Sequence, residues 1–195
     1  MKSMEFIDEI YAVKQAIEVA TKAHENQTRA DGITPYITHP ALVATLVSMY
    51  SGNKTELTIV AWLHDVKEEL RVNHIGELII DEYLQTCGLH YEVASEIDGM
   101  LNALTKNNRI VSRDDRNFEN LQQILNTHEG ATLVKICDRM ANLFDVEHKG
   151  RTFARKYLDE SKTLCDVLSR RANEFGYYVP LCDLLALIEE KEKTI

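Results

Sequence analysis

Three short stretches of this chain carry the side chains best suited to chemistry. The first follows the apolar run 57–63 and places His64 next to Asp65, with Glu68 and Glu69 shortly after them. Burying an ionisable pair at the end of an apolar segment is costly unless a counter-charge or a metal ion compensates. This stretch is therefore the first candidate for a functional site.

The other two stretches can complete a metal site around that pair. His39 lies in the segment 35–40, and Asp138 lies in the segment 134–143. Together with the first pair they supply two imidazoles and two carboxylates. Such a mixed set of nitrogen and oxygen ligands suits a hydrolytic divalent metal ion.

Helical spacing relates these residues to further candidates. Residues four apart on a helix share a face, which pairs His64 with Glu68 and Asp138 with Asn142. If both segments are helical, Glu68 reaches the same space as the metal ligands. We expect His39 to enter from the start of a third helix, because the proline that follows it suits a first helical position.

Each of these residues also has an ordinary structural explanation. His64 and Asp65 could cap a helix, and His39 could precede a proline by chance. Asp138 could pair with Arg139 at the surface. Spacing alone leaves a metal site as one possibility among several.

The composition predicts an all-α protein. The 195 residues suit one domain with a real core, and 45% hydrophobic with 27% charged residues is typical of a soluble globular protein. Only 8 Gly and 3 Pro are present, which favours helices over a turn-rich β fold. Apolar periodicity and turn residues predict loops at about 27–38 and 105–116 and helices at about 4–26, 40–50, 55–69, 73–83, 91–104, 117–127, 131–146, 152–175 and 180–192.

The charge and the N-terminus limit the classes of partner. A net charge of −9 argues against a nucleic-acid surface, although a metal ion and a few basic residues can still bind a small phosphorylated ligand. No run is apolar enough to cross a membrane, and no secretory leader is evident. We expect a cytoplasmic protein without a membrane or nucleic-acid partner, and the sequence leaves open whether it is a homo-oligomer.

The order of the candidate ligands resembles the H…HD…D pattern of the HD superfamily of metal-dependent phosphohydrolases. In this chain the pattern is His39, then His64 with Asp65, then Asp138. The resemblance implies an HD-domain helical bundle in which these four residues hold one divalent metal ion, which we expect to be Mn²⁺. The metal ion would lower the pKa of a bound water and polarise a phosphoryl oxygen.

Longer motifs resemble the hydrolase domain of Rel/SpoT alarmone enzymes and their small stand-alone relatives. The segment 23–40 contains Ala-His-Glu-Asn-Gln-Thr-Arg, then a glycine, then Pro-Tyr-Ile-Thr-His-Pro. The segment 64–69 is similar to the family's His-Asp-x-x-Glu-Asp. The segment 135–143 is similar to its Lys-x-x-Asp-Arg-x-x-Asn-Leu.

The extent of the resemblance predicts one domain. We expect residues 1–195 to form a single HD-type phosphohydrolase domain, with a core at about 15–160 and C-terminal helices at about 152–192. The chain departs from the family pattern in three ways. The spacing from Gly32 to Pro35 is one residue longer than in the long Rel/SpoT proteins. Glu69 stands where the family usually has Asp, and Ala30 stands where the alarmone hydrolases commonly have a basic residue.

The resemblance also implies roles for residues beyond the metal ligands. Glu68 would orient or deprotonate the attacking water. Asn142 would position substrate or water, and Glu69 would serve as an acid partner or support the metal ligands. The longer side chain of Glu69 changes its reach relative to Asp.

Four residues are candidates for binding substrate. Arg29 lies in the signature loop, where a solvated arginine is the alternative. Tyr36 could stack on a base or simply pack beside the next helix. Lys106 belongs to a basic run that is either a solvated loop or a phosphate clamp, and Arg139 follows a candidate metal ligand.

The activity that the resemblance implies is removal of the 3′-pyrophosphate from guanosine alarmones such as ppGpp, which gives GDP and pyrophosphate. The first alternative is a phosphohydrolase of the same fold that acts on another nucleotide or phosphoester. The departures at Ala30 and Glu69 favour that alternative. A non-catalytic nucleotide-binding HD module is the remaining possibility.

Overall fold

The computed structural model describes residues 2–70 and 75–195 and is all-α, as the composition predicts. Among these residues the regular β structure is limited to one isolated bridge, between Thr28 and Pro35. The helices, in chain order, are α1 (Lys2–Ala23), α2 (Thr38–Ser51), α3 (Thr55–Leu63), α4 (Val66–Glu69), α5 (Ile75–Thr86), α6 (Tyr91–Leu104), α7 (Arg113–Leu125), α8 (Gly130–Leu143), the 3₁₀ helix η2 (Val146–Lys149), α9 (Arg151–Glu174) and α10 (Tyr178–Thr194).

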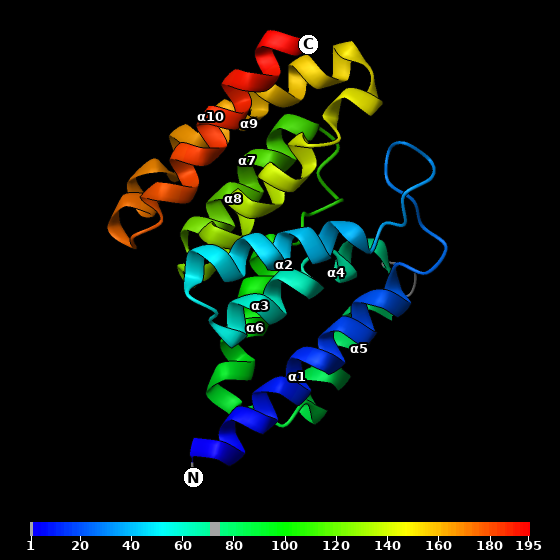
Figure 1. The fold of residues 1–195 in the computed structure, drawn as a ribbon, viewed down its shortest axis with the longest axis vertical. Coiled ribbons are helices and arrows are strands. Elements are labelled where there is room, and N and C mark those ends of the chain that lie inside the picture. Colours follow the sequence, from blue (N-terminus) through cyan, green and yellow to red (C-terminus); the bar gives the residue numbers. More distant parts are fainter. Residues whose placement is uncertain (1, 71–74) are drawn as a thin grey trace.

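Helix α8 forms the centre of the fold. All of its residues except Asn142 are buried, and it packs against α2, α3, α6, α7, α9 and α10. A helix that is surrounded in this way belongs to the core of a domain. Figure 1 shows the paired α9 and α10 on one side of the molecule and α1 along the opposite side. Any polar residue of α8 is therefore held in a fixed, dry environment.

Helix α2 begins two residues earlier than the proline predicts. It starts at Thr38, so His39 lies in its first turn and not at its cap. The helix ends as expected at Ser51, because Gly52 adopts a left-handed conformation (φ 68°) that suits a glycine after a helix. The early start matters for function because it places His39 where α2 packs against α8.

The single helix predicted over 55–69 is wrong. The chain forms α3, then a turn at His64 and Asp65, then the short α4. Both turn residues keep right-handed helical angles, so the amide of Glu68 still donates to the carbonyl of Asp65 at 3.0 Å. No glycine or proline marks this break. The break lies at the buried His64 and the half-buried Asp65, which face side chains of α2 and α8.

Two other helix starts differ from the predicted ones. Helix α7 begins at Arg113, about four residues before the predicted start, because Ser112 caps it by accepting from the amide of Asp115 at 3.3 Å. The basic segment that follows α6 is therefore partly helical. Helix α5 is described from Ile75, and its predicted start at residue 73 lies outside the described residues.

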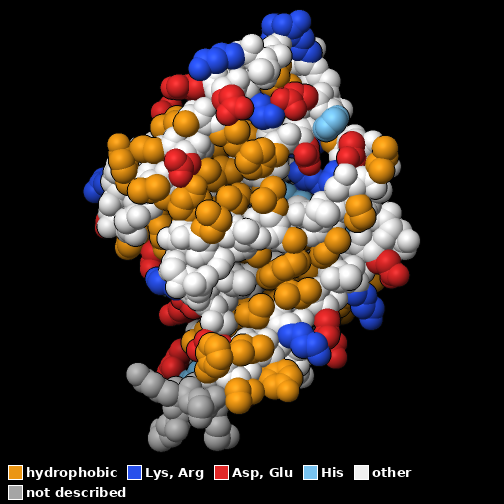
Figure 2. Space-filling model, viewed as in Figure 1, with side chains coloured by type: hydrophobic (Ala, Val, Ile, Leu, Met, Phe, Trp, Pro, Cys, Tyr) orange, Lys and Arg blue, Asp and Glu red, His pale blue; other side chains and the backbone are white. Residues whose placement is uncertain are grey.

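The surface of the molecule carries scattered apolar side chains. Figure 2 shows them around α10 and along α1, where large exposed examples are Tyr178, Val179, Phe6, Ile10 and Tyr11. Exposed apolar residues are normal on folded proteins. None of the helices in the described part of the chain combines the length and apolar character that a membrane span requires.

Candidate metal centre

Three helical segments bring the four expected metal ligands together. The Nε2 atom of His39 lies 3.4 Å from Asp65 Oδ2 and 3.3 Å from Asp138 Oδ1. The Nε2 atom of His64 lies 3.3 Å and 3.8 Å from the same two oxygens. Donor atoms from α2, the α3–α4 turn and α8 thus surround one small space, although Asp138 lies 74 residues after His64 in the chain.

The two imidazoles are buried without hydrogen bonds at the atoms that face this space. His39 and His64 are 2% and 4% exposed, and both Nε2 atoms have no hydrogen-bond partner among the described residues. The Nδ1 atom of His64 lies 2.7 Å from the carbonyl oxygen of Ala61. A proton on Nδ1 makes that hydrogen bond and leaves the lone pair of Nε2 directed at the carboxylates. A ligating histidine is normally held in this tautomer.

The donor set fits a metal ion. The ligand atoms of His39, His64 and Asp65 all lie within 4.8 Å of one another, and Asp138 contributes an oxygen beside both imidazoles. Buried polar atoms without partners are costly, and a cation between the two Nε2 atoms and the two carboxylates would give both of these nitrogens a partner. This cluster could therefore hold a metal ion.

The electrostatics of the cluster favour positive charge at its centre. Burial alone lowers the pKa of His64, but the carboxylates of Asp65 and Asp138 outweigh burial and leave that pKa raised. Burial raises the pKa of Asp65, yet the facing imidazoles hold it well below its usual range. For Asp138, burial is likewise outweighed by Lys135 and the imidazoles, so its pKa is also lowered. The same field attracts a divalent cation.

Tyr36 supports the cluster from outside. Its hydroxyl donates a hydrogen bond of 2.7 Å to Asp65 Oδ2, the oxygen of Asp65 that faces both imidazoles. Its ring lies 4.7 Å from the ring of His24 and 5.5 Å from that of His39. The tyrosine therefore orients a candidate ligand and also lines the cavity beside it.

Arg29 is placed behind Tyr36 and not in the cavity wall. It is 9% exposed, and its Nε donates to Asp145 at 2.7 Å. Its guanidinium also donates to the carbonyl of Ala141 at 3.3 Å and lies 5.6 Å from the centre of the Tyr36 ring. A solvated loop arginine, the alternative at the sequence level, is therefore wrong. Arg29 does not line the cavity beside the cluster, whereas Tyr36, Lys106 and Arg139 do.

The expected catalytic residues line the cavity beside the cluster. Glu68 and Glu69 line the cavity, and Glu68 Oε1 accepts from the backbone amide of Lys106 at 2.6 Å. Glu69 accepts from the side-chain amide of Gln27 at 3.4 Å. Asn142 donates to Asp138 Oδ1 at 2.6 Å and so holds a candidate metal ligand.

A cavity of about 200 Å³ opens beside the cluster and is lined by an unusual number of cations for an acidic protein. Lys106 and Arg139 were predicted as substrate contacts, and both line it. Lys135 lies 3.2 Å from Asp138 Oδ2. The charge of Lys135, together with burial, lowers the pKa of Lys106 to about 8. The basic residues in the wall are Lys106, Arg113, Lys135, Arg139 and Lys149.

Aromatic rings separate these cations along one wall. The rings of Phe153 and Tyr157 stack with centres 5.7 Å apart, and Arg139 lies 4.2 Å from the centre of the Tyr157 ring. Lys149 and Arg113 lie 5.4 Å and 5.2 Å from the centre of the Phe153 ring. We did not predict this wall from the sequence. Phe153 and Tyr157 lie four residues apart within the helix predicted over 152–175, which is a signal that could have indicated their shared face.

Comparison with known proteins shows which proteins this chain resembles in sequence. No family model matches the chain. It is 30% identical over 161 residues to the bifunctional (p)ppGpp synthase/hydrolase SpoT of Escherichia coli, a match that covers 78% of this chain and 21% of that protein. It is 27% identical over 135 residues to the human guanosine-3′,5′-bis(diphosphate) 3′-pyrophosphohydrolase MESH1, which covers 68% of each. The chain spans about a fifth or less of the length of the first curated relatives that it matches.

A solved structure has the same fold. It is described as a metazoan ortholog of SpoT that hydrolyzes ppGpp, and it superposes with a TM-score of 0.69 over 90% of this chain and 94% of the other at 20% identity. The expected HD-domain helical bundle is thereby confirmed. The resemblance to SpoT-type proteins that the motifs predict is also confirmed.

Proposed function

We propose that this chain is a metal-dependent hydrolase that removes the 3′-pyrophosphate from guanosine alarmones such as ppGpp, giving GDP and pyrophosphate. One observation carries the proposal: two imidazoles with unbonded Nε2 atoms and two carboxylates surround one space beside a cavity rich in cations. The names of similar proteins include this activity, which supports ppGpp as the proposed substrate. A small nucleotide is accordingly the proposed ligand, within a single HD-type domain.

The proposed metal ligands are His39, His64, Asp65 and Asp138. Mn²⁺ suits their mixed nitrogen and oxygen donors. When bound, such an ion supplies Lewis-acid polarisation of a phosphoryl oxygen and lowers the pKa of a bound water.

Glu68 is the proposed general base. In this reaction, water attacks the phosphorus joined to the ribose 3′ oxygen, and the bond to that oxygen breaks. Glu68 takes the proton from the water, and Glu69, on the same wall, returns a proton to the 3′ oxygen. Pyrophosphate then carries the oxygen of the water. Asn142 holds Asp138 in place through its 2.6 Å hydrogen bond.

The cations in the wall are proposed to bind the phosphate oxygens. Lys106, Lys135 and Arg139 approach the cavity from the side of α8 and offset the negative charge that builds up during transfer. For Arg29 and Tyr36 we propose an indirect part in substrate binding. Arg29 fixes Tyr36 and the signature loop through Asp145, and Tyr36 fixes Asp65.

The test is turnover across a nucleotide panel with and without metal. The purified chain with Mn²⁺ should convert ppGpp to GDP and pyrophosphate, and chelation should abolish the activity until Mn²⁺ is restored. Full activity in demonstrably metal-free protein would overturn the metal assignment. If ppGpp is untouched while another nucleotide is hydrolysed, the alarmone assignment fails and the metal site stands.

A further inference from the structure

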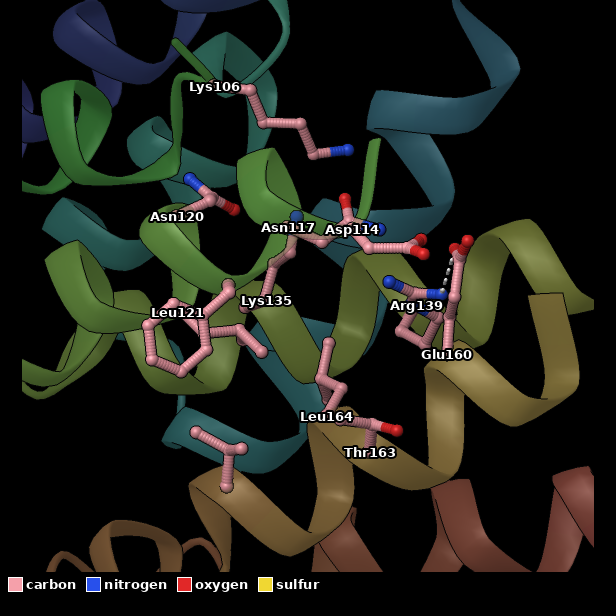
Figure 3. Close-up of a pocket in the computed structure, with 12 residues that line it drawn as sticks. Lys106, Asp114, Asn117, Asn120, Leu121, Lys135, Arg139, Glu160, Thr163 and Leu164 are labelled. Atoms are coloured by element: carbon pink, nitrogen blue, oxygen red, sulfur yellow. Dashed lines mark ion pairs between the residues drawn. The ribbon is translucent and has the colours of Figure 1, made fainter. Parts of the chain in front are cut away.

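A second cavity, of about 160 Å³, lies between α7, α8 and α9 behind the cation wall. Figure 3 shows it in close-up, with Lys106 entering from one side and Arg139 facing Glu160 on the other. Lys106, Lys135 and Arg139 line both this cavity and the one beside the metal cluster. The two cavities therefore share three cations in their walls.

The outer half of the second cavity is apolar. Leu121 and Leu164 are buried in its floor, and Val167 lies beside them. Phe118 stands at the edge with 62% of its surface exposed, although a large aromatic ring gains most from burial. These apolar walls suit the faces of one flat ring system.

The inner half of the cavity contains a buried guanidinium, that of Arg139, with an N–H group that has no acceptor among the described residues. Arg139 is 6% exposed, and its Nε has no hydrogen-bond partner among the described residues. Among the described residues its guanidinium makes a 3.2 Å hydrogen bond to Ser161 and lies 4.0 Å from Glu160. A buried guanidinium nitrogen without an acceptor is costly, and an anionic ligand would supply one.

The polar groups at the edge narrow the class of ligand. Asn117 and Thr163 line the cavity, and Asp114 adds a carboxylate that accepts hydrogen bonds. A ring that carries N–H groups and ring acceptors matches this combination of amide, hydroxyl and carboxylate.

We propose that the cavity between α7, α8 and α9 binds the heterocycle of a nucleotide whose phosphate lies on Lys106, Lys135 and Arg139. The ring packs between Phe118, Leu121 and Leu164. The nucleotide is either the substrate itself, reaching from the metal cluster, or a second nucleotide bound behind it. The proposal rests on the proposed function only for the choice of guanine nucleotides as probes.

The first test introduces a large side chain at the edge of the cavity. Thr163 is exposed, and its hydroxyl donates to the carbonyl four residues earlier, so Thr163→Trp should fold. Calorimetric titration of the full chain with Mn²⁺ should show GDP binding weakened by about tenfold or more, the scale of a lost base-stacking contact. Binding of inorganic pyrophosphate, which has no ring, should be unchanged.

The matched control is Thr21→Trp on α1. Thr21 is also exposed and also donates to the carbonyl four residues earlier, but it lies far from the cavity in sequence and lines neither cavity. It should leave both ligands unaffected. Wild-type GDP binding in Thr163→Trp, or equal weakening of GDP and pyrophosphate, would overturn the proposal.

A second variant keeps the test independent of how the tryptophan packs. Phe118→Ala removes the exposed ring and should weaken GDP about fivefold or more without affecting pyrophosphate. Phe6→Ala is its control, because Phe6 has the same 62% exposure on α1. If Phe118→Ala binds GDP as the wild type does, the ring site is wrong.

Steady-state kinetics separate the two sources of the heterocycle. If the ring belongs to the substrate, Thr163→Trp raises KM and GDP inhibits competitively. If it belongs to a second nucleotide, KM is unchanged and a non-competitive effect of GDP is lost. The binding experiment does not need turnover, so absence of ppGpp hydrolysis would overturn the proposed function and leave the nucleotide site standing.

Discussion

Two polar clusters, one around the buried Lys67 of α4 and one around His39 and His64, differ in how completely their buried atoms are paired. In the first, the Nζ atom of Lys67 donates to Asp98 at 2.8 Å and to Asn102 at 2.7 Å. Asn102 in turn donates to Asp98 at 3.0 Å. In the second, the imidazoles of His39 and His64 face carboxylates at 3.3–3.8 Å without making a hydrogen bond.

The difference shows how to separate a structural network from a site. The Lys67 network is closed, because its charges and amide groups bond to one another, and it needs nothing further to be stable. The histidine cluster keeps its nitrogen lone pairs directed at a common space. An arrangement that leaves buried atoms without partners persists where a ligand completes it.

The largest effect should come from a metal ligand. We expect Asp138→Ala to lose bound Mn²⁺ and to lower ppGpp turnover by more than about 10⁴-fold, the upper range for loss of one proton-transfer group. Elemental analysis measures the bound Mn²⁺, and an assay of ppGpp hydrolysis measures the turnover. Retained metal with retained activity would contradict the assignment of the cluster.

Replacing the proposed base should separate chemistry from metal binding. Glu68→Gln keeps the shape of the side chain and should retain Mn²⁺, but kcat should fall by ~10²–10⁴-fold. Steady-state assays of ppGpp hydrolysis measure the change in kcat. A near-normal kcat would refute the role of Glu68.

Removing the support of a ligand should have a smaller effect. Tyr36→Phe deletes the 2.7 Å hydrogen bond to Asp65 and should weaken Mn²⁺ binding by ~10–100-fold, as is typical of groups that orient metal ligands. Tyr50→Phe is the control, because Tyr50 donates an equally short hydrogen bond to Asp183. Equal metal affinities in the two variants would show that Tyr36 does not act through Asp65.

Disrupting the Lys67 network should lower the stability of the protein and leave its activity unchanged. Asp98→Ala leaves the Nζ of the buried Lys67 with one partner fewer, which should lower the free energy of unfolding by about 1–3 kcal/mol. Urea unfolding measures the change, and kcat of the folded protein should stay within about twofold. A large loss of kcat with unchanged stability would reverse the distinction between the clusters.

The smallest effect should be a pH dependence of substrate binding. The charge of Lys135 and burial lower the pKa of Lys106 to about 8, so Lys106 is cationic below that pH and loses its charge above it. KM for ppGpp should therefore rise a few-fold between about pH 7 and pH 9. In Lys106→Arg the guanidinium stays charged over this range, and the rise should be reduced. An identical pH profile in both proteins would exclude Lys106 as the group responsible.

Local sequence determined the helices and the identity of the candidate ligands. The apolar periodicity of 91–104 predicts α6 with the bounds that the structure has, because that helix packs one apolar face. Spacing alone did not single out the cluster of His39, His64, Asp65 and Asp138, which was predicted from the resemblance of their order to the H…HD…D pattern. The break between α3 and α4 was not predictable, because no glycine or proline marks it.

Only the tertiary structure decided which cations meet the cluster and which do not. Arg29 lies in the motif segment, yet it turns away to pair with Asp145, which is 116 residues later. Lys149 belongs to no motif quoted from the sequence, yet it lines the cavity. Side-chain spacing along a helix follows from its 3.6-residue period, whereas meetings between distant helices depend on how the whole core packs around α8.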